Sequence, residues 1–258
     1  MSFARVICCC LVLLSCAKRA KHFEPPKTIG VTGLLSVENQ FVELYGFPVG
    51  EGVLLIDTGV DAEAHGVDAL LSRLRRTREQ VSAVFLTHGH GDHTGAATLF
   101  PNAKVYGGKA DATLFEGTYE NPKRLGRWFS KSFKGKFFTI PNPLEGRQEL
   151  LIGDGSERLL AIPFAGHTPG TYLYLFRGVL FTGDTIAFKK EQIVPAPEMF
   201  HADTKQNLQA IIQLPTTLTG LTVDQLCTGH WGCTPFGKTQ PLLEGLVKEA
   251  QTALSELK

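Results

Sequence analysis

The stretch FLTHGHGDHTG, residues 85 to 95, carries three histidines and one aspartate within six positions, directly after an apolar run. Imidazole nitrogen and carboxylate oxygen are ligands that zinc and similar divalent metals accept. Gathering these groups costs desolvation and mutual repulsion unless a bound cation offsets both. We therefore expect a metal site here. The intervening glycines favour an extended stretch, which would turn the side chains of His88, His90 and Asp92 the same way, over a helix.

The chain on either side of this stretch alternates short apolar runs with amphipathic segments. Each apolar run ends in a polar turn that holds an aspartate or a histidine; the runs are 53–56, 81–86, 159–164, 179–182 and 221–227. Helical spacing of apolar residues predicts helices at 67–74, after an N-cap at Asp203, and at 242–254. Strands and helices that alternate in this way predict a mixed α/β (α+β) domain with its binding groups on loops beyond the strand ends.

The composition fits one folded domain. The chain has 258 residues, of which 43% are hydrophobic and 20% charged, and its formal net charge is +1. This length is sufficient for a large buried core. Because the net charge is close to zero, the chain as a whole offers no broad basic surface for nucleic acid, and a small-molecule substrate is expected instead.

The N-terminus indicates export. Residues 1–15 combine an early Arg5 with an apolar run that is shorter than the roughly 20 residues needed to cross a bilayer, so they read as a signal peptide. The residues before Cys16 resemble a bacterial lipobox, which predicts lipidation at Cys16 and anchoring in the periplasm or outer membrane. An ordinary secretory signal and an uncleaved anchor are the alternatives. Residues 16–28 would form a tether, and the domain would occupy 29–258.

Several other potential ligands have ordinary interpretations. His22, His65 and His201 are interpreted as hydrogen-bonded core or surface residues without a metal role. Cys227 and Cys233 are six positions apart, and the sequence leaves open whether they form a disulfide or remain separate thiols.

The ordered motifs of the chain resemble those of the metallo-β-lactamase superfamily. THGHGDH at 87–93 has the form His-x-His-x-Asp-His, and four further motifs follow the family order: IDTG with Asp57, GHTPG with His167, TGDT with Asp184 and TGHWG with His230. The resemblance extends from about residue 29 to the end of the chain. It implies an αββα four-layer sandwich with a metal site at one edge.

The resemblance also implies a role for each motif residue. His88, His90 and His167 would bind one Zn²⁺, and Asp92, His93 and His230 would bind a second. Asp184 would bridge the two ions, other divalent transition metals being possible, and Asp57 would hold a ligand by hydrogen bonds. A hydroxide shared by the ions would attack an electrophilic carbonyl or phosphorus, with Asp92 as the catalytic residue that orients it and relays its proton.

The expected reaction is therefore hydrolysis of an ester, thioester, lactone or amide by a dinuclear hydrolase. Asp184 resembles the bridging aspartate of glyoxalase II and lactonases, which β-lactamases generally lack at this position. Hydrolysis of β-lactams is therefore an alternative to the expected reaction and ranks below it. A mononuclear iron persulfide dioxygenase is a rival from another class, but it would need fewer ligands. A nuclease and a non-catalytic binding protein fit less well, because the chain lacks a broad basic surface and none of the ligands is missing.

Two segments are candidates for substrate contacts. Residues 121–138 have six basic residues and no acidic residue, and are interpreted as a lid, an acidic-substrate site, a membrane contact or a packed helix. The expected loop from Ile186 to Ala202, with Lys189 and Lys190, follows Asp184 and would border the cleft.

Overall fold

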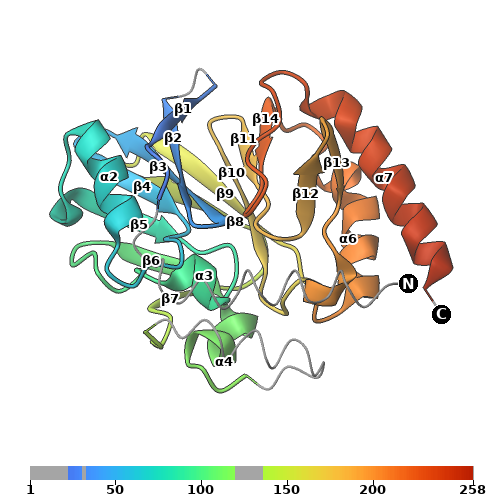
Figure 1. Ribbon diagram of the computed structural model, residues 1–258, viewed down its shortest axis with the longest axis horizontal. Helices are drawn as coiled ribbons and strands as arrows, with labels where there is room; N and C mark the ends of the chain where they lie inside the picture. The colour runs from blue at the N-terminus through green and yellow to red at the C-terminus, as the bar shows by residue number, and fades with distance from the viewer. Residues whose placement is uncertain (1–22, 31–32, 120–135, 258) are drawn as a thin grey trace.

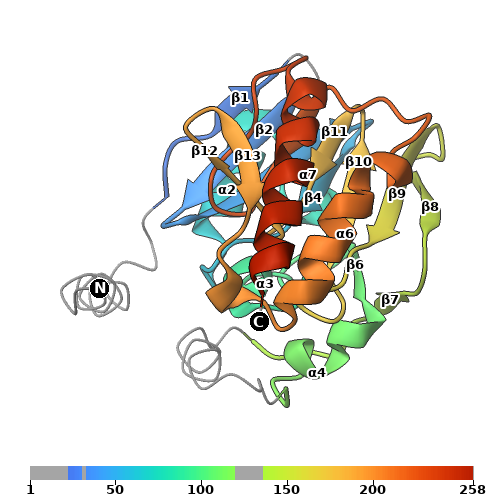
Figure 2. The same cartoon turned by 90° about the vertical axis from the view of Figure 1, so that its right-hand side faces the viewer.

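Two β-sheets face each other, and helices cover their outer faces (Figure 1). The computed structural model describes residues 23–30, 33–119 and 136–257. Helix α2 lies outside one sheet, while α6 and α7 lie side by side outside the other (Figure 2). The layers therefore follow the order helix, sheet, sheet, helix, which confirms the predicted αββα fold.

The first sheet has seven strands in the order of the sequence. They are β1 (Lys27–Ile29), β2 (Leu34–Asn39), β3 (Val42–Val49), β4 (Gly52–Ile56), β5 (Val81–Phe85), β6 (Lys104–Gly108) and β7 (Asn142–Leu144). Strands β1 to β4 are antiparallel, whereas β4 to β7 are parallel. The helices linked to this sheet are α2 (His65–Leu74), α3 (Gly91–Thr94) and α4 (Ala112–Phe115), with 3₁₀ turns at Arg78–Gln80 and Lys109–Asp111.

The second sheet has five strands in the order β14-β11-β10-β9-β8. They are β8 (Gln148–Ile152), β9 (Glu157–Pro163), β10 (Tyr172–Phe176), β11 (Val179–Phe181) and β14 (Gln225–Cys227). A separate hairpin consists of β12 (Ile186–Lys189) and β13 (Gln192–Pro195), followed by a 3₁₀ turn at Glu198–Phe200. Helices α6 (Thr204–Thr217) and α7 (Thr239–Glu256) complete this half.

Apolar side chains fill each space between the layers. Phe47, Phe85 and Tyr174 are among the buried residues between the sheets, and the rings of Phe85 and Tyr174 lie 5.2 Å apart. Val67 and Leu70 of α2 pack on the first sheet, whereas α6 and α7 contribute a third cluster on the second. The strands are therefore covered on both faces, which explains why the sequence shows continuous apolar runs instead of a strict alternation.

Most predicted elements are confirmed. Strands form at 52–56, 81–85, 157–163 and 179–181, and the Asp203 carboxylate caps α6 by accepting the backbone N–H of Gln206 at 2.8 Å. Two expectations were wrong in part. The run 221–227 forms a strand only at Gln225–Cys227, and the expected loop 186–202 contains the β12–β13 hairpin, because its apolar Ile186 and Ile193 pack against the second half.

The first described residues already contact the sheet. Phe23 forms an isolated bridge with Asn39, and β1 begins at Lys27, two residues before the expected start of the domain at Ile29. The predicted signal peptide, Cys16 and nearly all of the segment 121–138 lie outside the described residues. Within the described ranges, no helix is both long and apolar enough to cross a membrane.

Candidate metal centre

The motif residues meet at one edge of the two facing sheets, because each follows the end of a strand. His88 and His90 follow β5, and Asp92 and His93 lie on the short helix α3. From the second sheet, His167 follows β9, Asp184 follows β11 and His230 follows β14. Parallel strands end at the same edge of a sheet, so the loops beyond them bring distant residues together. The structure thus joins all seven residues that the sequence predicted.

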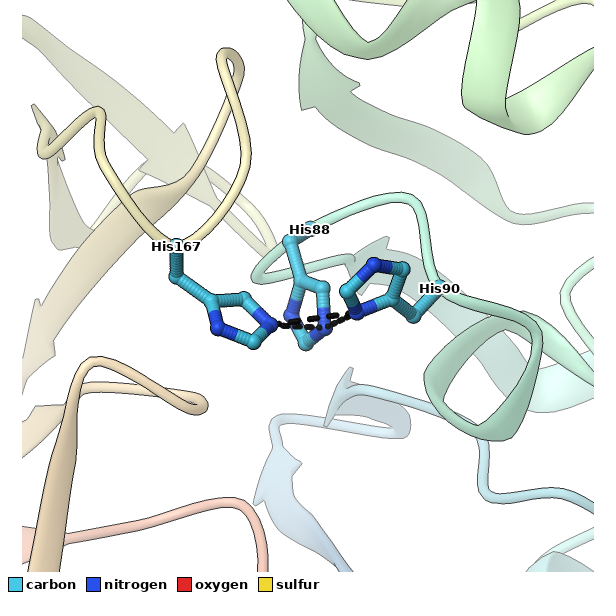
Figure 3. Close-up of side chains that lie close together, drawn as sticks. All are labelled: His88, His90 and His167. Atoms are coloured by element: carbon cyan, nitrogen blue, oxygen red, sulfur yellow. Dashed lines mark hydrogen bonds between the residues drawn. The ribbon is translucent and has the colours of Figure 1, made fainter. Parts of the chain in front are cut away.

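Three imidazole nitrogens form a triangle (Figure 3). His88 Nε2 lies 3.0 Å from His90 Nδ1, and His167 Nε2 lies 3.2 Å and 3.1 Å from these two atoms. Three nitrogens at mutual contact distance cannot all be satisfied by hydrogen bonds with one another. Nitrogen ligands at about 2.0–2.1 Å from a tetrahedral zinc ion lie roughly 3.3 Å apart. The triangle therefore has nearly the dimensions of three zinc ligands.

A second group lies beside the first and consists of Asp92, His93 and His230. Asp92 Oδ2 is 3.9 Å from His93 Nε2 and 3.6 Å from His230 Nε2. Asp184 lies between the groups: its Oδ2 is 3.8 Å from His167 Nε2 in the first group and 2.9 Å from His230 Nε2 in the second. Asp184 is thus the carboxylate that touches both groups, as the predicted bridging role requires.

Two buried atoms in the centre have no hydrogen-bond partner among the residues that the structure describes. They are His93 Nε2 and Asp184 Oδ1, which lie 3.4 Å apart. Leaving a buried polar atom unsatisfied costs about 1–3 kcal/mol. A neutral His93 donates from Nδ1 to Asp57 and turns the lone pair of its Nε2 toward Asp184 Oδ1, a pair of atoms suited to a cation between them. The residues present therefore fit the metal that the motifs imply.

The electrostatics differ across the centre. Burial, together with neighbouring imidazoles, lowers the pKa of His88 and of His167 well below the ordinary value. At His93 burial also lowers the pKa, but the carboxylates of Asp184, Asp57 and Asp92 outweigh it and raise the pKa well above the ordinary value. The carboxylate side of the centre therefore stabilises positive charge, while the imidazole side keeps neutral nitrogens as metal ligands require.

Asp57 occupies the supporting position that the sequence predicted. Its carboxylate accepts hydrogen bonds from the Thr87 backbone N–H and hydroxyl, each at 2.8 Å, and lies 2.8 Å from His93 Nδ1. Since the Thr87 hydroxyl donates to Asp57, it can accept from His88 Nδ1 at 3.1 Å. One carboxylate thus holds two imidazoles with their Nε2 atoms facing the centre. His230 is held in the same sense by the Phe41 carbonyl, 2.7 Å from its Nδ1.

The expected extended stretch is only half correct. His90 is extended, with φ −72° and ψ 143°, but Gly91–Thr94 form the helical turn α3. The glycines did not prevent this turn, since Gly91 stands at its first position, where it disrupts no preceding turn. The turn places Asp92 and His93 beside His230, in the second group.

Asp111 is a supporting residue that the sequence interpretation missed. It is fully buried, and its carboxylate accepts hydrogen bonds from the Gly89 N–H at 2.8 Å, the Gly170 N–H at 2.6 Å and the Thr168 hydroxyl at 2.6 Å. Burial raises its pKa, although these donors oppose the shift. Asp111 joins the loop of His88 and His90 to the loop of His167. Its place in the β6–α4 connection carries no local signal for that role.

Of the remaining histidines, His65 and His201 are placed, whereas His22 lies outside the described residues. The Nδ1 atoms of His201 and His167 lie 3.3 Å apart, so the interpretation of His201 as an ordinary residue overlooked a contact with the centre. His65 instead lies 2.7 Å from Asp61, away from the centre. Cys227 and Cys233 form a disulfide that closes the short loop carrying His230. Thus the structure decides the alternative that the sequence left open.

One cation lies beside the centre. Lys189, at the end of β12, places its Nζ 5.1 Å from the centre of the Trp231 ring, and that ring lies 5.4 Å from the His230 ring. Lys189 is exposed, so its ammonium is accessible to a ligand. The expectation that the segment after Asp184 approaches the site is met at this residue.

Comparison with protein-family models matches residues 42–230 to the metallo-beta-lactamase superfamily. Among curated proteins, the uncharacterized protein YobT of Bacillus subtilis is 30% identical over 149 residues, which are 53% of this chain and 58% of that protein. A hydroxyacylglutathione hydrolase of Aeromonas hydrophila is 31% identical over 137 residues, which are 52% of this chain and 42% of the hydrolase. The chain thus spans only about half the length of these two relatives.

The fold is similar to that of solved metallo-β-lactamases. The metallo-beta-lactamase GOB-18 from Elizabethkingia meningoseptica has a TM-score of 0.67 at 20% identity, covering 93% of this chain and 96% of its own. BJP-1, a subclass B3 metallo-beta-lactamase of Bradyrhizobium japonicum, has a TM-score of 0.66 at 17% identity, covering 93% and 97%. At these identities the likeness shows a shared fold.

Proposed function

This chain belongs to the metallo-β-lactamase superfamily, and from that membership we propose that it is a hydrolase that uses two Zn²⁺ ions to cleave an ester, thioester, lactone or amide bond. His88, His90 and His167 would hold one ion, and Asp92, His93 and His230 the other. Asp184 would be shared by both. Hydrolase is the activity in the names of several relatives, such as the hydroxyacylglutathione hydrolase of Aeromonas hydrophila, whereas the metal number and the bond cleaved are specific to the proposal.

The observation that carries the proposal is the position of Asp184. Its Oδ2 lies near His167 of the first group and His230 of the second, and its Oδ1 lies near His93 of the second. A mononuclear centre would need only the three imidazoles of the first group. The buried Nε2 of His93 and Oδ1 of Asp184, both without hydrogen-bond partners, would then remain unsatisfied at a cost of about 1–3 kcal/mol each.

Bound divalent ions in such a centre supply Lewis acidity and lower the pKa of water towards neutrality. Asp92 is the residue placed to handle the proton released in hydrolysis. Its side chain is 14% exposed, in contrast to the fully buried His93 next to it, so it connects the centre with solvent. Its Oδ2 lies 3.6 Å from His230 Nε2. Asp92 would therefore orient the attacking water and pass the proton outward.

A substrate that carries a carboxylate fits the surroundings of the centre. The Lys189 ammonium lies over Trp231, whose ring lies next to His230, and supplies positive charge near the centre. A thioester is the substrate class of the hydroxyacylglutathione hydrolase relative. We expect Lys189→Ala to raise KM for a carboxylate-bearing ester several-fold and to leave kcat nearly unchanged, with a neutral ester as control. An equal loss on both esters would contradict this assignment.

The test is metal analysis and a hydrolysis screen on the same purified sample. The expected result is two zinc ions per chain and turnover of at least one thioester, lactone, aryl ester or amide substrate. A content clearly below two metals, or bound iron with consumption of dioxygen, would overturn the dinuclear hydrolase and favour the persulfide dioxygenase. Turnover confined to nitrocefin would instead favour β-lactamase activity.

Export with a lipid anchor at Cys16 is part of the same proposal. The Cys227–Cys233 disulfide supports it, because structural disulfides persist mainly in oxidising compartments. Metabolic labelling with a radioactive fatty acid should mark the full-length protein in a bacterial host and should fail for Cys16→Ser. Labelling of the Cys16→Ser protein, or none of the unchanged protein, would contradict the anchor.

A further inference from the structure

His167 has an outer hydrogen-bond partner unlike those of the other ligands. His93 and His230 place Nδ1 against the Asp57 carboxylate and the Phe41 carbonyl, both of which accept hydrogen bonds. His167 instead places Nδ1 3.3 Å from Nδ1 of His201, with the two rings perpendicular. An imidazole nitrogen either donates or accepts, so the polarity of this contact depends on what holds the far side of His201.

The far side of His201 faces a backbone carbonyl. His201 Nε2 lies 3.1 Å from the Ala196 oxygen, and Ala196 itself is fixed by donating its N–H to the Thr185 carbonyl at 3.2 Å. A carbonyl oxygen only accepts, so Nε2 of a neutral His201 carries the proton and its Nδ1 is an acceptor. His167 must then donate from Nδ1. Its Nε2 lone pair is consequently directed at His88 and His90.

The backbone around His201 holds the same loop without using the imidazole. The Ala202 N–H donates to the His167 carbonyl and the Asp203 N–H donates to the Gly166 carbonyl, each at 2.9 Å. Both imidazoles are almost completely buried, with 2% of His201 and 1% of His167 exposed. Water therefore does not compete for the contact, and a change of the His201 ring leaves the backbone bonds in place.

Asn207 offers a competing assignment. Asn207 Nδ2 lies 3.4 Å from His201 Nε2, so the amide could donate to it and reverse the direction of the hydrogen bond between His201 and His167. This contact is longer than the 3.1 Å contact with Ala196. The reversed hydrogen bond would also place the proton of His167 on Nε2, in the centre of the triangle, where it would repel a cation.

We propose that His201 is a positioning residue that holds His167 in the Nδ1–H tautomer, so that its Nε2 is a ready metal ligand. The proposal rests on the metal-binding function proposed above. It adds a relay from Ala196 through His201 to His167, in which the acceptor is supplied by an imidazole and not by a carboxylate. Removing such a partner typically lowers metal affinity about 10- to 100-fold.

The test compares three variants by competitive zinc titration. In H201N the amide oxygen can occupy the position of Nδ1 and accept from His167, whereas in H201Q the amide reaches the Nε2 position and serves Ala196 instead. We expect H201N to bind zinc nearly as tightly as the unchanged protein, and H201Q and H201L to bind about 10- to 100-fold more weakly. H65N, which removes an imidazole distant from the centre, is the matched control.

A tautomer measurement keeps the test decisive if H201L does not fold. Long-range ¹H–¹⁵N spectra of the zinc-free protein should show the proton of His167 on Nδ1, and H201N should retain it there. A proton on Nε2 of His167 in the unchanged protein, or equal zinc affinity in H201L and the unchanged protein, would overturn the proposal. If the unchanged protein bound no zinc while keeping the Nδ1–H tautomer, the proposed function would fail and the positioning contact would stand.

Discussion

Replacement of Asp111 should destabilise the protein and weaken zinc binding together. The carboxylate satisfies two buried backbone donors, Gly89 and Gly170, as well as the Thr168 hydroxyl. In Asp111→Ala the Thr168 hydroxyl can turn to Thr171 Oγ1, 2.7 Å away, but the two backbone N–H groups have no such option. At about 1–3 kcal/mol for each orphaned donor, the free energy of unfolding should fall by roughly 2–6 kcal/mol.

Asp111→Asn gives a milder and more informative change. The amide oxygen can face Gly89 and Thr168, and the NH₂ group then opposes only the Gly170 N–H. With one orphaned donor, the free energy of unfolding should fall by about 1–3 kcal/mol, which leaves most of the stability of a typical domain. Because Gly89 lies between His88 and His90, its release should also reduce zinc affinity.

Urea unfolding followed by circular dichroism, with and without zinc, measures both effects. Asp154→Asn is the control, since the Asp154 carboxylate also accepts a backbone N–H, from Ser156 at 3.0 Å, but is exposed. A D111N stability within about 0.5 kcal/mol of the unchanged protein, the range of ordinary surface substitutions, would refute the reasoning. A fall in the free energy of unfolding of D154N as large as that of D111N would refute it as well.

Three further outcomes follow from the same structure. Asp184→Ala should lower zinc occupancy and activity together, and unchanged metal content would contradict its bridging position. Burial, followed by repulsion from the facing Glu38, raises the pKa of Glu43 from about 4.5 to about 7. The folded protein therefore favours the protonated carboxyl, and the stability that Glu43 contributes is fully present below pH 4.5 and is lost as the pH rises through 7. Glu43→Gln should thus flatten the dependence of the unfolding free energy on pH between these values, and an unchanged slope would refute this. Replacing Cys227 and Cys233 by serine should cost about 2 kcal/mol of stability for so short a loop, whereas equal unfolding midpoints of this variant and the oxidised unchanged protein would refute that value.

The ligands themselves could be read from the sequence. His88, His90, Asp92 and His93 lie together in one stretch, and His167, Asp184 and His230 each follow an apolar run that forms a strand. Hydrophobic runs report local burial, and burial decides which segments become strands. Once the strands are known, the loops at their ends are the places where ligands can converge, so the mixed α/β class and the candidate donors follow from local patterns. The four-layer arrangement and the assignment of the donors to two ions came from the resemblance to the family.

The partners that hold those ligands were decided by tertiary structure. Asp111 is 22 residues from Gly89 and 59 from Gly170, and His201 is 34 from His167. A single aspartate or histidine in a connecting segment looks the same whether it is solvated or buried against a ligand. Its role depends on which donor or acceptor the packing of the two sheets brings within 3 or so ångströms. The sequence by itself therefore determined which groups are available to bind a metal, and the folded chain decided how each of them is oriented, because hydrogen-bond partners of buried groups are chosen by spatial proximity.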